Sequence, residues 1–326
     1  MQNLKSARAG TFRLENSSNE LDPSDLQPAS SFEFDAYLKS RVRLIEQALE
    51  PCAIQTGGPG ERLSEAMRYS LLSGGKRLRP ILALGACEAV GGRIENAMGL
   101  ACAIEMIHTY SMIHDDLPCM DNDDLRRGKP TNHRVYGEAI ATLAGDALLT
   151  DAFGIVARNT PAGVSRIALV ETIAELSSAA GSAGMVGGQT IDLMDEGRSV
   201  SIEDLEYLHS RKTGALFVAA VMGGGRLGGG NAAQLAALGA YARAIGLAFQ
   251  VIDDLLDVEG STEQMGKRTQ KDHQRGKVTY PSLLGVEASR EFAEALRLKA
   301  GEALSEFDYH AEPLRRLANF AVERNS

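Results

Sequence analysis

The sequence has no tryptophan, 5% aromatic residues, and almost none of the alternation between β-branched and polar residues that half-buried strands require. These shortages argue against an all-β architecture. Helix-forming residues such as alanine, leucine, glutamate and arginine are abundant instead. With 326 residues, 44% of them hydrophobic, the chain can bury one large core. We therefore expect an all-α fold.

Positive charge is also in short supply, since the formal net charge is −9 at pH 7. A chain this acidic is not expected to bind nucleic acid in general, so local bases and bound metal must attract any anionic substrate. The sequence lacks an apolar run of membrane-spanning length and a signal-peptide core, which predicts a cytoplasmic protein without a membrane span. Its four cysteines form no CxxC pair, which favours reduced, mostly buried thiols.

The chain divides into two parts. Residues 1–31 are polar and rich in serine, asparagine, aspartate and proline, which predicts a flexible N-terminal extension. A few early basic residues would suit a transit peptide, but acidic Glu15, Glu20 and Asp22 argue against one. Helical patterning then continues to the end, so we expect residues 32–326 to form a single domain.

The stretch from Ile104 to Thr131 carries the strongest chemical pattern. Apolar residues cover most of the helix circumference at its start, which predicts a buried helix. A polar stripe of His108, Ser111 and Asp115 follows it at i, i+3 and i+7. Burying an unpaired carboxylate is unfavourable, so this helix end requires a cation. Acids and then bases follow, namely Asp121, Asp123, Asp124, Arg126, Arg127 and Lys129. This order indicates a site for magnesium and a diphosphate.

Asp115 and Asp121 need a local distortion to meet. Six residues rotate about 240° around an ideal helix, so their side chains converge only if the helix bulges or ends between them. Pro118 lacks an N–H and clashes with the preceding turn, which predicts a distorted turn at Leu117 to Met120. A calcium EF-hand is excluded because Leu125 takes the fifth loop position and no glutamate follows at the twelfth.

A second acidic segment lies near residue 253. Its polar residues share one helical face at i, i+3, i+4 and i+7, and they are Gln250, Asp253, Asp254 and Asp257. A solvated face would normally include lysine partners at this spacing, but here it is acidic within an apolar helix. Bases follow again, at Lys267, Arg268, Lys271 and Lys277. The repeated order favours metal binding over a charged surface.

Two glycine-rich segments do not match a P-loop. Ser73 to Pro80, SGGKRLRP, lacks the required GxxxxGK[ST] spacing, and its own residues indicate a helix end with solvated bases. Gly223 to Gly230 lacks the following Lys-Ser/Thr and is interpreted as a flexible connection between helices. In a third segment, HSRKTGA, Lys212 and Thr213 could contact a phosphate oxygen.

Together these segments resemble the trans-isoprenyl diphosphate synthases from about Phe32 to the C-terminus. The motifs occur in that family's order as GGKRLRP, DDLPCMDNDDLRRGKPT, GGQ, KTGAL, FQVIDDLLD and GKVTYP. The resemblance implies the isoprenoid synthase fold, a bundle of long helices around a deep central cavity. It also implies that the two acidic motifs face each other across the cavity mouth.

The resemblance further assigns site residues. Three magnesium ions are expected on Asp115, Asp121 and Asp253, with Asp116, Asp254 and Asp257 as nearby ligands or supporting groups. The allylic diphosphate is expected to contact Arg126, Lys212, Thr213, Gln250 and Lys267. Isopentenyl diphosphate is expected to contact Lys76, Arg79, His108 and Arg127. The family is usually homodimeric, and the apolar Leu82 to Ala103 region is a possible interface.

The implied reaction is a condensation of isopentenyl diphosphate with dimethylallyl or geranyl diphosphate. Metals and bases stabilise the leaving pyrophosphate, so the allylic carbon–oxygen bond ionises. The alkene of isopentenyl diphosphate, held in near-attack geometry, then attacks the allylic cation. The intermediate loses a proton to the departing pyrophosphate, so no protein base is required.

In the family that this chain resembles, residues just before the first acidic motif form the floor of the cavity and set product length. Tyr110 lies five residues before Asp115, roughly 7.5 Å along the helix. With Ser111 beside it, an aromatic ring there should stop the tail after three isoprene units, which predicts farnesyl diphosphate. The alternative is a geranylgeranyl diphosphate synthase, because Met106 to Asn132 also resembles the plant and bacterial enzymes with that product.

Three alternative functions are considered for this chain. A terpene cyclase would share the fold and the first motif, but it would carry an Asn/Ser/Glu-type second motif where this chain repeats DDxxD. A non-catalytic partner subunit of another synthase would be expected to lose one acidic motif, and both are intact here. A helical metal-binding scaffold without chemistry is the third, and pyrophosphate release separates it from an enzyme.

Overall fold

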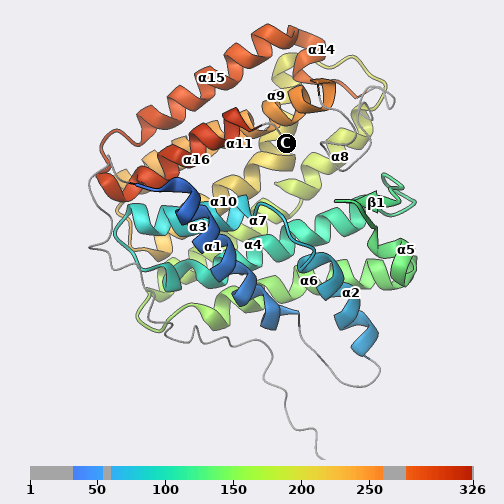
Figure 1. The fold of residues 1–326 in the computed structure, drawn as a ribbon, viewed down its shortest axis with the longest axis horizontal. Helices are drawn as coiled ribbons and strands as arrows, with labels where there is room; N and C mark the ends of the chain where they lie inside the picture. The colour runs from blue at the N-terminus through green and yellow to red at the C-terminus, as the bar shows by residue number, and fades with distance from the viewer. Residues whose placement is uncertain (1–31, 54–59, 260–276, 325–326) are drawn as a thin grey trace, which may run out of the picture.

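The computed structural model describes residues 32–53, 60–259 and 277–324 (Figure 1). The predicted N-terminal extension and Lys267 therefore lie outside the described residues. The chain first forms α1 (Phe34–Leu49), η2 (Glu50–Cys52), α2 (Glu61–Leu71), α3 (Leu78–Ala89), α4 (Ile94–Asp115), β1 (Leu125–Arg126), β2 (Lys129–Pro130), α5 (Asn132–Tyr136) and α6 (Glu138–Asn159). It continues through α7 (Arg166–Ala180), α8 (Met185–Asp195), α9 (Ile202–His209), η3 (Ser210–Gly214), α10 (Ala215–Leu227), α11 (Ala232–Glu259), α14 (Tyr280–Leu284), α15 (Val286–Ala303), η4 (Tyr309–Ala311) and α16 (Glu312–Glu323).

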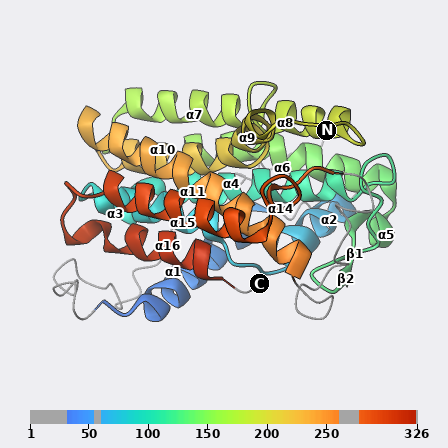
Figure 2. The same cartoon turned by 90° about the horizontal axis from the view of Figure 1, so that it is seen from above.

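The all-α prediction is confirmed. In the described ranges the only strands are β1 and β2, which form one short antiparallel ladder with Arg126 opposite Lys129. Long helices lie roughly parallel to one another in the view from above (Figure 2). The small ladder projects from one end of the bundle, directly after the first acidic motif.

α4 is the central helix of the bundle. It packs against α3, α6 and α10, and every residue from Ala97 to Ile107 is buried. A helix covered on all sides must be apolar around its whole circumference, as the sequence predicted. The polar end of α4, at Asp115, leads into the end of the bundle that carries the small ladder.

The glycine run between α10 and α11 differs from the prediction of a flexible connection. Gly223 to Gly225 belong to α10, and only residues 228–231 form the connection. A Cβ atom on Gly224 would lie 2.1 Å from the carbonyl oxygen of Ala83 in α3. The glycines thus allow α10 and α3 to pack closely.

The predicted dimer interface at Leu82 to Ala103 is wrong. This region is buried within the chain, since α3 and α4 form the core. Large exposed apolar side chains lie instead on α6 and α7, where Leu143, Ile167 and Val170 are 52%, 71% and 65% exposed. The periodicity identified an apolar surface correctly but could not tell which elements cover it.

Two helices of the described chain, α6 and α11, are long and apolar enough to cross a membrane by length and composition. The sequence analysis had found no such run. Both helices pack against others in the bundle, α6 against α4 and α11 against α15. Buried core helices of globular proteins meet the same criteria.

The cysteine prediction is confirmed. Cys52, Cys87 and Cys102 are buried free thiols, and Cys119 is an exposed one.

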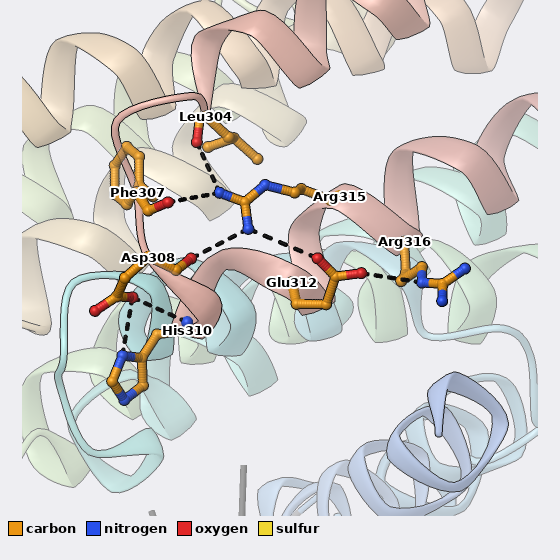
Figure 3. A network of polar contacts seen from close by, with 7 residues as sticks. All are labelled: Leu304, Phe307, Asp308, His310, Glu312, Arg315 and Arg316. Carbon is orange, nitrogen blue, oxygen red and sulfur yellow. Dashed lines mark hydrogen bonds and ion pairs between the residues drawn. The ribbon is translucent and has the colours of Figure 1, made fainter. Parts of the chain in front are cut away.

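The turn between α15 and α16 is held by one arginine (Figure 3). The Arg315 guanidinium donates to the carbonyl oxygens of Leu304 and Phe307 at 2.9 and 2.7 Å. It also forms an ion pair with Glu312 at 3.6 Å. Because these carbonyls follow the end of α15, Arg315 fixes the direction in which α16 begins.

Candidate active site

The turn after α4 brings the first acidic motif together. α4 ends at Asp115, and the N–H of Asp121 donates to the carbonyl oxygen of Asp115 at 2.7 Å. The N–H of Asn122 donates to Leu117 at 3.0 Å, closing a turn around Pro118. The predicted distorted turn is confirmed, and it returns Asp121 to the end of the helix.

The surroundings of Asp115 disfavour its ionised form. Burial raises the pKa of its carboxyl to about 6, Lys212 opposes that rise, and Asp121 adds to it. The neighbouring Asp116 is buried and accepts from the Arg126 guanidinium with both oxygens, at 2.6 to 3.0 Å. Asp116 thus orients Arg126, while Asp115 keeps an excess of negative charge near it.

Lys212 reaches this site from a π-helical turn, η3. Such wide turns often occur at functional sites because they re-aim side chains. Gly188 of α8 makes room for it, since a Cβ there would lie 2.3 Å from the backbone nitrogen of Lys212. The GGQ segment therefore serves close packing of α8 against η3.

Asp192 of α8 was missed by the sequence analysis. Its Oδ2 accepts from Lys212 at 2.5 Å and from Lys277 at 2.8 Å. Although burial opposes the shift, the two lysines lower the pKa of Asp192 to about 2. The sequence offered one signal for Asp192, its position about one helical turn after Gln189 of the GGQ motif. Its two lysine partners could not be predicted, because they come from distant segments of the chain.

The second acidic motif is connected to η3 by hydrogen bonds. Thr213 donates to Gln250 at 2.9 Å, and Gln250 donates to Asp254 at 2.9 Å. The N–H of Tyr280 donates to the other oxygen of Asp254 at 3.0 Å. Asp254 is therefore a buried internal acceptor. Its neighbours differ, because Asp257 is buried and Asp253 is partly exposed.

The GGKRLRP segment is more than a solvated helix end. Lys76 is exposed as predicted, but Arg77 is buried and adopts a left-handed backbone with φ of +50°. Its guanidinium donates to Glu105 of α4 at 2.5 Å and to the carbonyl oxygen of Leu71 at 2.9 Å. The buried pair ties the loop to the central helix, so the solvated interpretation is wrong for Arg77.

The remaining basic residues surround His108. Arg79 lies beside a pair of rings that pack on each other, 4.8 Å from the centroid of Phe217 and 6.0 Å from that of Phe249. Arg127 donates to the carbonyl oxygen of Gly74. Burial, followed by the charges of four nearby arginines, lowers the pKa of His108 well below its usual value. His108 is therefore neutral at pH 7.

The two residues assigned to chain length differ in their surroundings. Tyr110 is 5% exposed, its ring lies edge-on to that of His114 at 5.6 Å, and burial raises the pKa of its hydroxyl to about 12. His114 in turn contacts the carbonyl oxygen of Thr142 on α6 at 3.0 Å. Ser111 donates to the carbonyl oxygen of His108 within α4. Tyr110 thus packs against His114, which in turn contacts α6.

The carboxylates suit a metal held jointly with a ligand. Within the described ranges, no three acidic, histidine or cysteine side chains converge as a complete metal site. Burial raises the pKa of Asp115, and Lys212 and Arg126 oppose that rise only in part, so a bound cation would stabilise the ionised carboxylate. Hard oxygen ligands of this kind suit magnesium, which usually takes one or two carboxylates plus phosphate oxygens. The residues present therefore fit a magnesium–diphosphate complex.

Two small cavities lie beside residues of this site. The two best-defined cavities among the described residues have volumes of only about 30 and 10 Å³. The larger one is lined by side chains that include Thr109, Asp116 and Arg126, and the smaller by Asp192 and Lys277 among others.

Comparison with known proteins identifies the family. The polyprenyl synthetase profile matches residues 60–310. The chain belongs to the polyprenyl synthetase family. It is 51% identical over 300 residues to a chloroplastic geranylgeranyl pyrophosphate synthase of Catharanthus roseus, covering 91% of this chain and 83% of that protein. It is 50% identical over 302 residues to the corresponding protein of Capsicum annuum, covering 92% and 81%.

Solved structures agree on the isoprenoid synthase fold. An apo FPP/GFPP synthase from Zymomonas mobilis is 40% identical, with a TM-score of 0.80 over 89% of this chain and 98% of that one. A geranyltransferase from Helicobacter pylori, complexed with magnesium and isoprenyl diphosphate, is 33% identical, with a TM-score of 0.79 over 89% and 97%. This polyprenyl synthetase is a prenyltransferase of the trans-isoprenyl diphosphate synthase type.

Proposed function

We propose that this polyprenyl synthetase condenses isopentenyl diphosphate with allylic diphosphates and that geranylgeranyl diphosphate is its main product. One observation carries the reaction. Two carboxylates and two cations interact electrostatically at one end of the central helix, namely Asp115, Asp121, Arg126 and Lys212. Paired carboxylates with cations beside them match the needs of a metal-bound diphosphate that leaves during the reaction.

The protein's own cations act on the leaving group. Arg126, oriented by Asp116, and Lys212, held by Asp192, place positive charge where pyrophosphate departs. Such preorganised charge stabilises the transition state of ionisation. Magnesium, when bound, would be held by Asp115, Asp121 and Asp253 and would add electrophilic stabilisation of the same group.

Isopentenyl diphosphate is assigned to the separate basic patch. The positive charge of this patch comes from Lys76, Arg79 and Arg127. Neutral His108 can donate a hydrogen bond to the diphosphate without adding positive charge. The Arg77–Glu105 pair fixes the loop that carries Lys76 and Arg79. Holding the alkene beside the allylic carbon replaces a bimolecular encounter with an oriented reaction.

The product assignment rests on the relatives. Two proteins about half identical to this chain over nine-tenths of its length are geranylgeranyl pyrophosphate synthases. Farnesyl diphosphate is the second candidate, because buried Tyr110 lies five residues before Asp115. The Tyr110 ring packs edge-on against His114, so the product depends on whether the growing tail can pass this ring.

Product analysis tests this assignment. The purified protein is incubated with magnesium, isopentenyl diphosphate and dimethylallyl diphosphate, and chain length is determined after dephosphorylation. Mainly geranylgeraniol supports the proposal, whereas mainly farnesol from both the parent and Tyr110→Ala would contradict it. If the parent yields farnesol and Tyr110→Ala yields longer chains, Tyr110 is the floor and the farnesyl assignment replaces ours.

We further propose a cytoplasmic homodimer that associates through α6 and α7. Leu143, Ile167 and Val170 give these helices an exposed apolar face, which marks an association surface. Light scattering should give the mass of a dimer, and Ile167→Glu with Val170→Glu should shift it to that of a monomer. A monomeric parent at micromolar concentration would overturn the dimer.

A further inference from the structure

The C-terminal end of the described chain lies at the second acidic motif. Arg324 follows α16 directly, and its Nη2 donates to Oδ1 of Asp253 at 2.6 Å. The same nitrogen donates to the carbonyl oxygen of Phe249 at 2.8 Å, and the guanidinium carbon lies 3.7 Å from the centroid of the Phe249 ring. The Arg324 side chain is only 6% exposed. An arginine from the end of the chain thus contacts an aspartate 71 positions earlier.

Most of what holds Arg324 does not involve Asp253. Its Nε donates to the carbonyl oxygen of Ala321 at 3.2 Å, and Phe249 supplies both a carbonyl and a ring. α16 itself packs against α11 and α3, and the Arg315 contacts fix its other end (Figure 3). The guanidinium is therefore preorganised beside Asp253 rather than brought there by it.

Arg324 also lies near the basic patch. Although Lys76 is largely exposed, partial removal of its amine from water lowers its pKa, and the charge of Arg324 lowers it further. Burial lowers the pKa of Arg79 as well, and Arg324 contributes to that shift after the opposing effects of Glu105 and Asp253. Asp253 is the carboxylate that faces these cations from α11. Among the described residues, Arg324 hydrogen-bonds only Oδ1 of Asp253, which leaves Oδ2 for a cation.

We propose that Arg324 is a positioning residue that holds the Asp253 carboxylate for a divalent cation. The inference rests on the proposed function, in which Asp253 is a magnesium ligand. A carboxylate fixed through one oxygen presents the other in a defined direction, so less freedom is lost when the metal binds. Removing such an outer partner typically weakens metal affinity by about 10- to 100-fold.

Two truncations isolate Arg324 without disturbing the core. One chain ends at Glu323, and its matched control ends at Arg324 and lacks only Asn325 and Ser326. Thermal unfolding of each is followed during a magnesium titration at fixed inorganic pyrophosphate, which reports metal binding without relying on turnover. We expect the control to match the full chain, and the chain ending at Glu323 to need about 10- to 100-fold more magnesium for half-maximal stabilisation.

Two full-length variants refine the comparison. Arg324→Gln should resemble the chain that ends at Glu323, because the amide cannot replace the charged donor. Arg324→Lys should give an intermediate magnesium requirement, since it retains the charge without the planar arrangement of donors. Condensation assays on the same proteins should show the loss at low magnesium and recovery at high magnesium.

Several outcomes would overturn the proposal. An unchanged magnesium midpoint in the chain ending at Glu323, even with a lower melting temperature, would show that Arg324 only anchors α16. A lower midpoint would show that arginine and metal compete for Asp253. If the folded full chain responded to neither magnesium nor pyrophosphate and released no product, the proposed function would fail together with this role.

Discussion

Replacing Glu105 by alanine tests the buried pair that supports the basic loop. The Arg77 and Glu105 side chains are 1% and 3% exposed, and their charged atoms lie 2.5 Å apart. Removing one partner of a buried pair destabilises a protein by about 3–5 kcal/mol because the other charge is left uncompensated. Arg77 retains its hydrogen bond to Leu71, so we expect the lower end, about 3 kcal/mol.

The same arginine provides the control. Glu46 lies 4.0 Å from Arg77, but its side chain is 47% exposed, so Glu46→Ala should change stability by about 0–1 kcal/mol. Urea denaturation gives both free energies, with midpoints compared at equal slope. Equal losses for Glu46→Ala and Glu105→Ala would refute the reasoning. The double variant Arg77→Met with Glu105→Leu should recover much of the stability, since neither charge remains buried.

Three further changes have defined outcomes. Asp115→Asn should abolish activity yet raise the free energy of unfolding at pH 7. Because the pKa of Asp115 is raised to about 6 in the native state, the native state loses stability as pH rises from about 4 to 6. Equal free energies of unfolding for the parent and the variant at pH 7, measured in urea, would contradict this. Gly224→Ala should destabilise by about 1–3 kcal/mol through contact with Ala83, whereas Gly301→Ala, with open space around it, should not, as melting temperatures can show. Asp192→Asn should lower the rate at saturating substrate, because Lys212 loses the partner that aims it; an unchanged rate would remove Asp192 from the site.

Local patterns predicted the central features of the site. The apolar circumference of α4 predicted its burial, and Pro118 predicted the turn that returns Asp121 to Asp115. Both follow from residues within a few positions of one another. The spacing of Gln250, Asp253 and Asp254 likewise placed them on one helical face, because helical periodicity alone determines that arrangement.

Contacts between distant segments were not predictable in this way. Nothing near Arg77 indicates that Glu105 will accept from it, and no motif around Arg324 indicates Asp253. The sequence around Gly224 suggested a loop. The contact that requires glycine there is with the backbone of Ala83, which lies in another helix. The choice between a solvated and a buried base depends on tertiary packing, which the sequence pattern does not contain.

Pyrophosphate release tests the central claim most directly. The purified protein is given magnesium with isopentenyl diphosphate, with dimethylallyl diphosphate, or with both, and released pyrophosphate is measured over time. The proposed condensation predicts release only when both substrates are present, and none from the Asp115→Ala variant. Release from dimethylallyl diphosphate alone at the same rate, or equal release by Asp115→Ala, would contradict it.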